Sequence, residues 1–134
     1  MMRLKLLGAS GLRVSELCLG TMTFGTDWGW GADEATSRAI FERFVAEGGN
    51  FIDTANNYTN GASERFVGGL IAAERDRYVV ATKYTLRNTA LDAHDANGGG
   101  NSRKSMARSV ERSLQALRTD YIDLLYLHMW DETT

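Results

Sequence analysis

Residues 50–82, NFIDTANNYTNGASERFVGGLIAAERDRYVVAT, decide the fold of this chain. Asn50 to Thr54 is a short apolar run of strand length, and Tyr78 to Thr82 is a second one. Between them, Ser63 is a candidate N-cap for a helix whose apolar residues recur at helical spacing: Phe66, Val67, Leu70 and Ile71. A strand, a helix and a strand in this order predict two parallel strands joined by a crossover helix.

The same alternation extends to both sides of this stretch. On the N-terminal side, ELCLGTMTF (16–24) predicts a strand, and a helix follows that begins after Asp33 and ends at Gly48-Gly49. On the C-terminal side, a helix begins at Ser102, and the run Tyr121 to Leu127 predicts a fourth strand. The apolar faces expected of these two helices are Ile40, Phe41, Phe44 and Val45, and Met106, Val110, Leu114 and Leu117. Repeated strand and helix units place the chain in the α/β class.

A β-hairpin precedes these units. Its predicted arms, Arg3 to Leu7 and Leu12 to Ser15, flank a glycine-bracketed connection. We therefore treat residues 1–134 as a single partial domain, with the N-terminal hairpin at residues 1–16 and the repeated strand and helix units at residues 17–134. Periodicity does not distinguish a barrel from an open doubly wound sheet, and no G-x-G-x-x-G follows the first strand. A (β/α)₈ barrel takes about 250 residues, so four strands correspond to half of one.

Composition and charge narrow the possible partners. Fifteen Lys and Arg against seventeen Asp and Glu give a net charge of -2, so we expect no nucleic-acid or membrane partner. The one cysteine, Cys18, cannot form an internal disulfide, which favours a cytoplasmic setting. Because the longest apolar runs are only of strand length and the first residues lack a signal-peptide core, we predict neither a membrane span nor an export signal.

The carboxyl ends of the predicted strands are where we expect chemistry, because these ends share one rim in parallel α/β folds. Thr21 ends the first strand, Asp53 ends the second, Lys83 follows the third and His128 follows the fourth. Tyr58 lies five residues after Asp53 and can fold its phenol over the same rim. Each residue alone is more often structural, as a cap, a solvated lysine or a core histidine. Their convergence predicts a proton-transfer site.

This set of groups suits the protonation of an oxygen that gains negative charge. Lys83 would stabilise the phenolate of Tyr58, and Asp53 would hold Lys83 charged and oriented. His128 could donate to a carbonyl oxygen or relay a proton. Reduction of a carbonyl by hydride needs this step, and the hydride must come from a cofactor because no side chain carries one.

Four stretches of the chain resemble the aldo-keto reductase family. They are LGASGLRVSELCLGTMTFG (7–25), FIDTANNY (51–58), ATK (81–83) and DLLYLH (123–128). The second matches the family's D-T-A-x-x-Y segment, and the others resemble its opening hairpin with the first strand and its third and fourth strand ends. Together they cover almost the whole chain. The resemblance implies a (β/α)₈ barrel of the TIM type, of which this chain has the hairpin and about four βα units.

The resemblance also implies an activity, namely NADPH-dependent reduction of an aldehyde or ketone to an alcohol. It gives Tyr58 the role of general acid, makes Lys83 and Asp53 its tuning pair, and has His128 orient the carbonyl. It places the nicotinamide ribose near Gly20, Thr21, Met22 and Asp53. The family's carboxamide contacts, its nicotinamide-stacking residue and its grip on the 2′-phosphate belong to the half of the barrel that this chain lacks.

Half a barrel leaves two open sheet edges, which allow three outcomes. The chain is a truncated reductase completed by further strands, or two copies close a barrel together, or it is a non-catalytic remnant. The alternative to an enzyme is an interaction or nucleotide-sensing module that self-associates.

Two further features receive structural interpretations. Cys18 is expected to be a small buried hydrophobe in the first strand. Lys104, Arg108 and Arg112 recur every four residues, and we expect a solvated helix face there, with a phosphate-binding stripe as the less favoured alternative.

Overall fold

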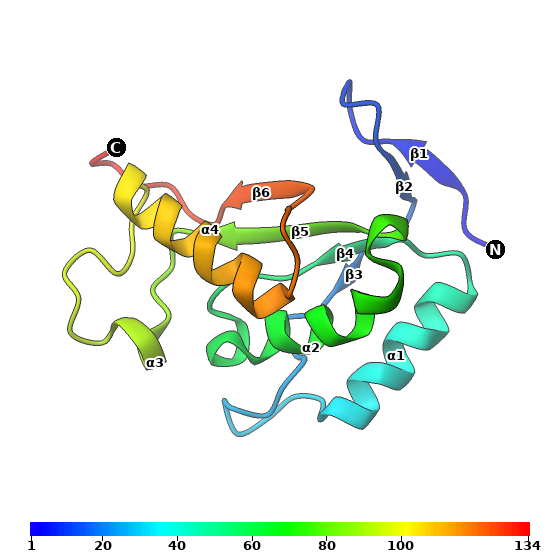
Figure 1. Ribbon diagram of the computed structural model, residues 1–134, viewed down its shortest axis with the longest axis horizontal. Helices are drawn as coiled ribbons and strands as arrows, with labels where there is room; N and C mark the ends of the chain where they lie inside the picture. Colours follow the sequence, from blue (N-terminus) through cyan, green and yellow to red (C-terminus); the bar gives the residue numbers. More distant parts are fainter.

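The computed structural model describes residues 1–134 and consists of a hairpin and a parallel sheet (Figure 1). The hairpin pairs β1 (Leu4–Leu6) and β2 (Arg13–Ser15) in antiparallel fashion. The sheet has the strands β3 (Leu19–Gly20), β4 (Phe51–Asp53), β5 (Val79–Tyr84) and β6 (Leu124–Leu127). These four strands lie in chain order and every neighbouring pair is parallel. The α/β class and the crossover connections expected from the sequence are therefore confirmed.

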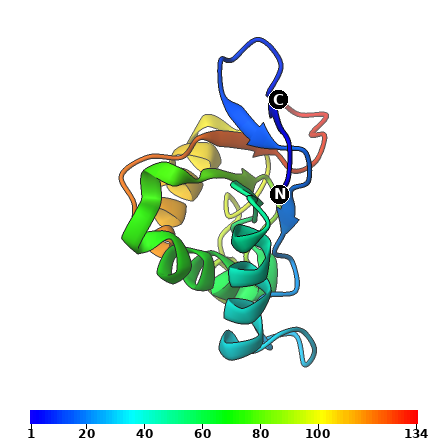
Figure 2. The same cartoon turned by 90° about the vertical axis from the view of Figure 1, so that its right-hand side faces the viewer.

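Helices connect the parallel strands and cover one face of the sheet (Figures 1 and 2). The main helices are α1 (Glu34–Ala46), α2 (Ala62–Ile71) and α4 (Arg103–Leu117). Shorter elements are the 3-10 turns η1 (Tyr58–Gly61) and η2 (Ala72–Arg77) and the one-turn helix α3 (Thr89–Asp92). With the helices outside and the other sheet face open, the arrangement is a partial (β/α)₈ barrel, as expected. None of these helices has the length and apolarity that crossing a membrane requires.

The core lies between the sheet and its helices. Ile52 of β4 and Val80 of β5 pair with each other in the sheet, and both side chains are fully buried. The other members of this cluster come from the helices and the loops beside them: Phe24, Phe41, Val67, Ile71, Tyr78 and Leu117. Because side chains alternate along a strand, the residues on either side of Ile52 point to the opposite, open face.

Two of the predicted helix starts are confirmed and one is wrong. Asp33 caps α1 by accepting a 2.8 Å hydrogen bond from the Thr36 amide, and Ser102 caps α4 by accepting from the Ser105 amide at 3.2 Å. Ser63 does not cap α2, which begins after Gly61. Gly61 has φ +85, a left-handed conformation that glycine adopts without steric cost and that turns the chain into the helix. Ser63 is instead buried inside the helix.

The inward face of α4 agrees with the expected one only in part. Leu117 is buried as predicted, but so are Ser105 and Ser113, whereas Met106 is 37% exposed. The close approach of α2 explains the small buried residues, because a Cβ at Gly68 of α2 would lie 2.7 Å from the Leu117 carbonyl group. Val110 and Leu114 of the predicted apolar face are half-buried.

Arg108 and Arg112 of α4 do not form the purely solvated face that the sequence favoured. Arg112 forms an ion pair with Asp92 at 2.6 Å, and Arg108 pairs with Asp95 at 2.5 Å and with Asp92 at 3.4 Å. Asp92 is buried at the end of α3. These pairs attach the long β5–α4 loop to the helix that follows it, so the two arginines organise a loop beside the strand ends.

Candidate functional site

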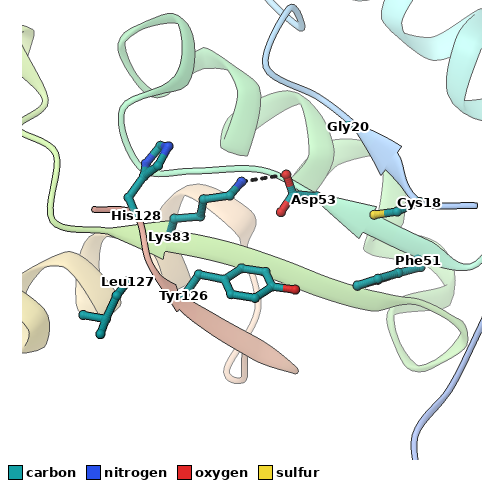
Figure 3. A pocket seen from close by; sticks show the side chains of 8 residues that line it. All are labelled: Cys18, Gly20, Phe51, Asp53, Lys83, Tyr126, Leu127 and His128. Atoms are coloured by element: carbon teal, nitrogen blue, oxygen red, sulfur yellow. Dashed lines mark hydrogen bonds and ion pairs between the residues drawn. The ribbon is translucent and has the colours of Figure 1, made fainter. Parts of the chain in front are cut away.

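The open face of the sheet carries a cavity of about 500 Å³ that extends from the start of β4 to the carboxyl ends of the strands (Figure 3). Its walls come from all four parallel strands and the residues that adjoin them, so segments far apart in the sequence share one surface. The lining residues are Cys18, Gly20, Phe51, Asp53, Lys83, Tyr126, Leu127 and His128. The hairpin lies at the amino-terminal end of the sheet (Figure 1).

Lys83 is the centre of the site. Its Nζ donates to Asp53 Oδ2 at 2.6 Å, to the Thr54 carbonyl at 2.8 Å and to Tyr58 Oη at 3.1 Å. An ammonium has three donors and no acceptor, so all three protons are used and the Tyr58 oxygen must accept. The phenol proton of Tyr58 therefore stays free for another partner. The Lys83 side chain is only 14% exposed, which strengthens these charge-assisted bonds.

Tyr58 is held in place by the backbone that follows β4. Thr54 N–H donates to the Ala81 carbonyl and Asn56 N–H to the Lys83 carbonyl, so this segment continues alongside β5. The next anchor is Thr59, which is fully buried with φ +46. Its hydroxyl donates to the Phe24 carbonyl at 2.6 Å and accepts from the Ser63 amide at 3.1 Å. These bonds fix the turn that directs the phenol of Tyr58 back to the rim.

His128 completes the group at the end of β6. Its ring packs edge-on against the Tyr58 ring, with centroids 5.6 Å apart and planes at 82°. Burial, and secondly the charge of Lys83, lower the pKa of His128 below its ordinary value, against an opposing effect of Asp53. The imidazole is therefore neutral at pH 7. Its Nδ1 atom is buried and has no hydrogen-bond partner within the chain.

The four residues expected near a nicotinamide ribose occupy different positions. Gly20 and Asp53 line the cavity. Met22, two residues after Gly20, is 45% exposed and is not among the residues that line the cavity. The Thr21 side chain is fully buried on the helix-covered face, where its hydroxyl donates to the Asp53 carbonyl at 2.9 Å and contacts Ser63 Oγ at 2.8 Å. Only the backbone of Thr21 is thus placed to face the rim.

Four lining residues were not predicted as site residues: Cys18, Phe51, Tyr126 and Leu127. The first three each stand two residues before a lining residue at a strand end, namely Gly20, Asp53 and His128. Alternation along a strand puts residues i and i+2 on one face, so the period of two could have identified them. Cys18 is exposed on this face, which corrects the expectation that it is buried, because its strand turns that side chain away from the core.

The arrangement has the parts needed to protonate an oxygen. A phenol with a free proton, an ammonium that contacts its oxygen and a neutral imidazole lie within contact distance of one another beside an open cavity. The ammonium is in turn held by a carboxylate that is itself only 26% exposed. Fixed charges of this kind stabilise a developing oxyanion without reorganisation.

Sequence comparison relates the chain to several reductases. It is 50% identical over 133 residues to norsolorinic acid reductase from Aspergillus flavus, an alignment that includes 94% of this chain and 34% of that protein. It is 43% identical over 141 residues to a putative aryl-alcohol dehydrogenase from Saccharomyces cerevisiae, covering 96% of this chain and 65% of that protein. The chain therefore spans about a third of the length of the norsolorinic acid reductases that it matches.

Structure and family comparisons agree with these relatives. The fold matches an aldo-keto reductase from Bacillus halodurans, solved in its holo form, with a TM-score of 0.80 and 36% identity over 95% of this chain and 40% of that one. The family whose pattern matches is described as the aldo/keto reductase family, and the match covers residues 16–134. This chain, with its rim of Asp53, Tyr58, Lys83 and His128, belongs to the aldo/keto reductase family.

Proposed function

We propose that this chain carries the catalytic groups of an NADPH-dependent carbonyl reductase, which converts an aldehyde or ketone to an alcohol. The observation that carries the proposal is the set of bonds from Lys83 Nζ to Asp53 and to Tyr58 Oη. That set leaves the phenol proton free while a cation contacts the phenol oxygen. A group arranged in this way serves as a general acid.

In this proposal Tyr58 donates its proton to the carbonyl oxygen as that oxygen gains charge. Lys83 stabilises the phenolate that remains, at the 3.1 Å contact already present. Asp53 keeps the ammonium in place, because without it the lysine side chain would be free to turn toward solvent. The neutral His128 ring lies against Tyr58 and orients the carbonyl oxygen toward the phenol by donating an N–H to it.

The residues present fit a nicotinamide cofactor. The cavity of about 500 Å³ has the size of small-molecule sites, and Gly20 leaves its wall open because a Cβ there would meet nothing within 4 Å. When bound, NADPH supplies the hydride. Gly20, the backbone of Thr21, Met22 and Asp53 would hold its ribose in this proposal. The aryl-alcohol dehydrogenase among the relatives supports an aromatic carbonyl as the substrate, and the lone Cys18 supports a cytoplasmic setting.

A chimera tests the function, because the chain corresponds to only part of a whole reductase. The chain would replace its matching segment in the norsolorinic acid reductase of Aspergillus flavus, and oxidation of NADPH with an aromatic aldehyde would be followed by absorbance at 340 nm. We expect turnover with formation of the alcohol, and none from the same reductase with that segment deleted. A chimera that folds, as judged by circular dichroism, and binds NADPH but forms no alcohol with a panel of aldehydes and ketones contradicts the proposal.

A second candidate function is a self-associating, non-catalytic half-barrel. The observation that favours it is the open edge at β6 and the residues that follow it: Leu127 of β6 is 61% exposed, and Met129 and Trp130 after it are 54% and 85% exposed. Exposed apolar edge strands pair readily with another chain. Light scattering of the purified chain distinguishes the cases, since this candidate predicts a dimer or larger species and a monomer of 14.8 kDa contradicts it.

A further inference from the structure

Asn101, in the loop before α4, joins the segments that follow β5 and β6. Its side-chain Oδ1 accepts a hydrogen bond from the Thr85 hydroxyl, and its Nδ2 donates to the Met129 carbonyl at 3.0 Å. Its backbone N–H donates to Asp131 Oδ2 at 2.8 Å. Thr85 follows β5 directly, whereas Met129 and Asp131 follow β6. One residue from a third segment thus connects two strand ends of the rim.

Thr85 has an unusual conformation at this junction. Its φ is +99, where a β-branched side chain is strained. Such strain persists only where neighbouring contacts hold the residue, and here the Thr85 carbonyl accepts from the Gly100 amide at 2.7 Å while its hydroxyl donates to Asn101. The conformation turns the hydroxyl toward β6, where it also accepts from the His128 backbone N–H at 3.2 Å.

His128 has few other anchors. Its backbone N–H donates to the Tyr84 carbonyl at 3.0 Å as well as to Thr85, but its ring Nδ1 has no partner in the chain. The ring is therefore placed by its packing on Tyr58 and by the backbone from which it projects. A shift of the backbone at His128 would therefore move the ring, because no hydrogen bond to Nδ1 opposes the movement.

We propose that Asn101 is a positioning residue for His128, acting through Thr85 on one side and through Met129 and Asp131 on the other. An effect of Asn101 on catalysis rests on the proposed reductase function, whereas its effect on the position of the His128 ring does not depend on that function. The amide is well suited to this task because it supplies one acceptor and one donor together. An aspartate could accept from Thr85 but would present a carboxylate oxygen to the Met129 carbonyl.

Nuclear magnetic resonance of the 134-residue chain tests this directly. The chain has two histidines, so His94 in the β5–α4 loop serves as an internal reference for His128. In the wild type we expect a nuclear Overhauser contact between the His128 and Tyr58 rings. The imidazole of His128, which faces Lys83, Asp53 and Tyr58, should titrate below the ordinary histidine range.

Matched variants separate positioning from general damage to the loop. Asn101→Ala and Thr85→Val should remove the contact between the two rings and return the His128 titration toward the ordinary range, with His94 unchanged. Asn97→Ala, an exposed asparagine of the same loop, and Thr85→Ser, which keeps the hydroxyl, should behave as the wild type. In an active chimera, Asn101→Ala should lower kcat about tenfold or more, as expected for a misplaced group.

Two results would overturn the inference. One is an Asn101→Ala chain that folds and keeps both the ring contact and the His128 titration of the wild type. The other is equal behaviour of Thr85→Val and Thr85→Ser, which decides the matter if Asn101→Ala does not fold. An inactive chimera counts against the reductase proposal alone, because the resonance measurements do not depend on turnover.

Discussion

The two faces of the four-stranded sheet carry different tasks with the same strands. On β4, Ile52 faces the helices and is fully buried, whereas its neighbours Phe51 and Asp53 face the open cavity. On β5, Thr82 is buried against Glu64 of α2, whereas Lys83 holds Tyr58 and Asp53. Neighbouring residues on a strand therefore serve different purposes, one packing in the core and the next facing the cavity. A shift of one residue in the strand register would exchange the residues that face the core with those that face the cavity.

The largest expected difference between the faces is in stability. Ile52→Ala should lower the free energy of unfolding by about 2–5 kcal/mol, because it opens a cavity in a fully buried cluster. Phe51→Ala should cost clearly less, since the open face gives that ring few partners. Urea denaturation followed by circular dichroism measures both. If Ile52→Ala and Phe51→Ala lowered the free energy of unfolding equally, the two faces of the sheet would not differ in their contribution to stability.

The reverse difference is expected for turnover. In the reductase chimera, Lys83→Met on the open face should lower kcat by about 100-fold or more, since the phenolate loses its cation. Thr82→Val, its neighbour on the covered face, should leave kcat within a few-fold of the wild type and change stability instead, because it loses a hydrogen bond to buried Glu64. If Thr82→Val lowered kcat as much as Lys83→Met, the site would not be confined to the open face.

A smaller effect concerns the buried carboxyl on the covered face. Burial raises the pKa of Glu64 above its ordinary value, against hydrogen bonds from Thr82 and Ser113. The unfolded chain then ionises this group more readily, so wild-type stability falls as the pH rises above about 4.5. Glu64→Gln should be more stable than the wild type at pH 8 and lose that advantage near pH 4.

Urea denaturation across this pH range checks the Glu64 prediction. Glu111→Gln, an exposed position on α4, is the control and should follow the wild type throughout. An advantage of Glu64→Gln that is the same at pH 4 and at pH 8 would exclude ionisation of Glu64 as its cause.

The smallest effect lies at the rim beyond β6. Hydrogen bonds from Thr133 and from the Asn101 amide lower the pKa of Asp131 to about 2. A depressed carboxyl pKa contributes stability above its unfolded value of 3.8, and that contribution is lost as the pH falls toward 2. Carboxyl resonances of the chain should show Asp131 titrating near pH 2. A midpoint close to 4 would mean that the hydrogen bonds from Thr133 and Asn101 do not form in solution.

Much of the architecture could be predicted from the sequence because its determinants are local. Alternating strand and helix patterns predicted the parallel order, and Asp33 and Ser102 marked two helix starts by their side-chain chemistry. Ser63 misled because the turn before α2 depends on the left-handed Gly61 rather than on a capping side chain. Leu117 was predicted to face inward and does, but the buried Ser105 and Ser113 were missed because the close contact between α4 and Gly68 joins two helices far apart in the sequence.

The candidate site likewise has residues that the sequence could predict and a contact that it could not. The sequence could predict that Asp53, Lys83 and His128 lie close together, because the ends of parallel strands meet at one rim. The structure brings them together with Tyr58. Phe51 and Tyr126 would have followed from the period of two along the same strands. The link between Thr85 and Asn101 could not be predicted, since the two residues lie sixteen positions apart across a loop whose regular structure is the one-turn helix α3, and no sequence pattern indicates that contact.

The central claim is that the phenol at this rim acts as the acid in carbonyl reduction. Its most direct test compares Tyr58→Phe with Tyr126→Phe in the chimera, by the single-turnover rate of NADPH oxidation with an aromatic aldehyde and by NADPH affinity. Tyr126 lines the cavity, Tyr58 lies against Lys83 at its rim, and the two substitutions remove the same atom. The account predicts that Tyr58→Phe slows this rate by about 100-fold or more with affinity unchanged, while Tyr126→Phe keeps it. Equal rates for Tyr58→Phe and the unsubstituted chimera would contradict the account.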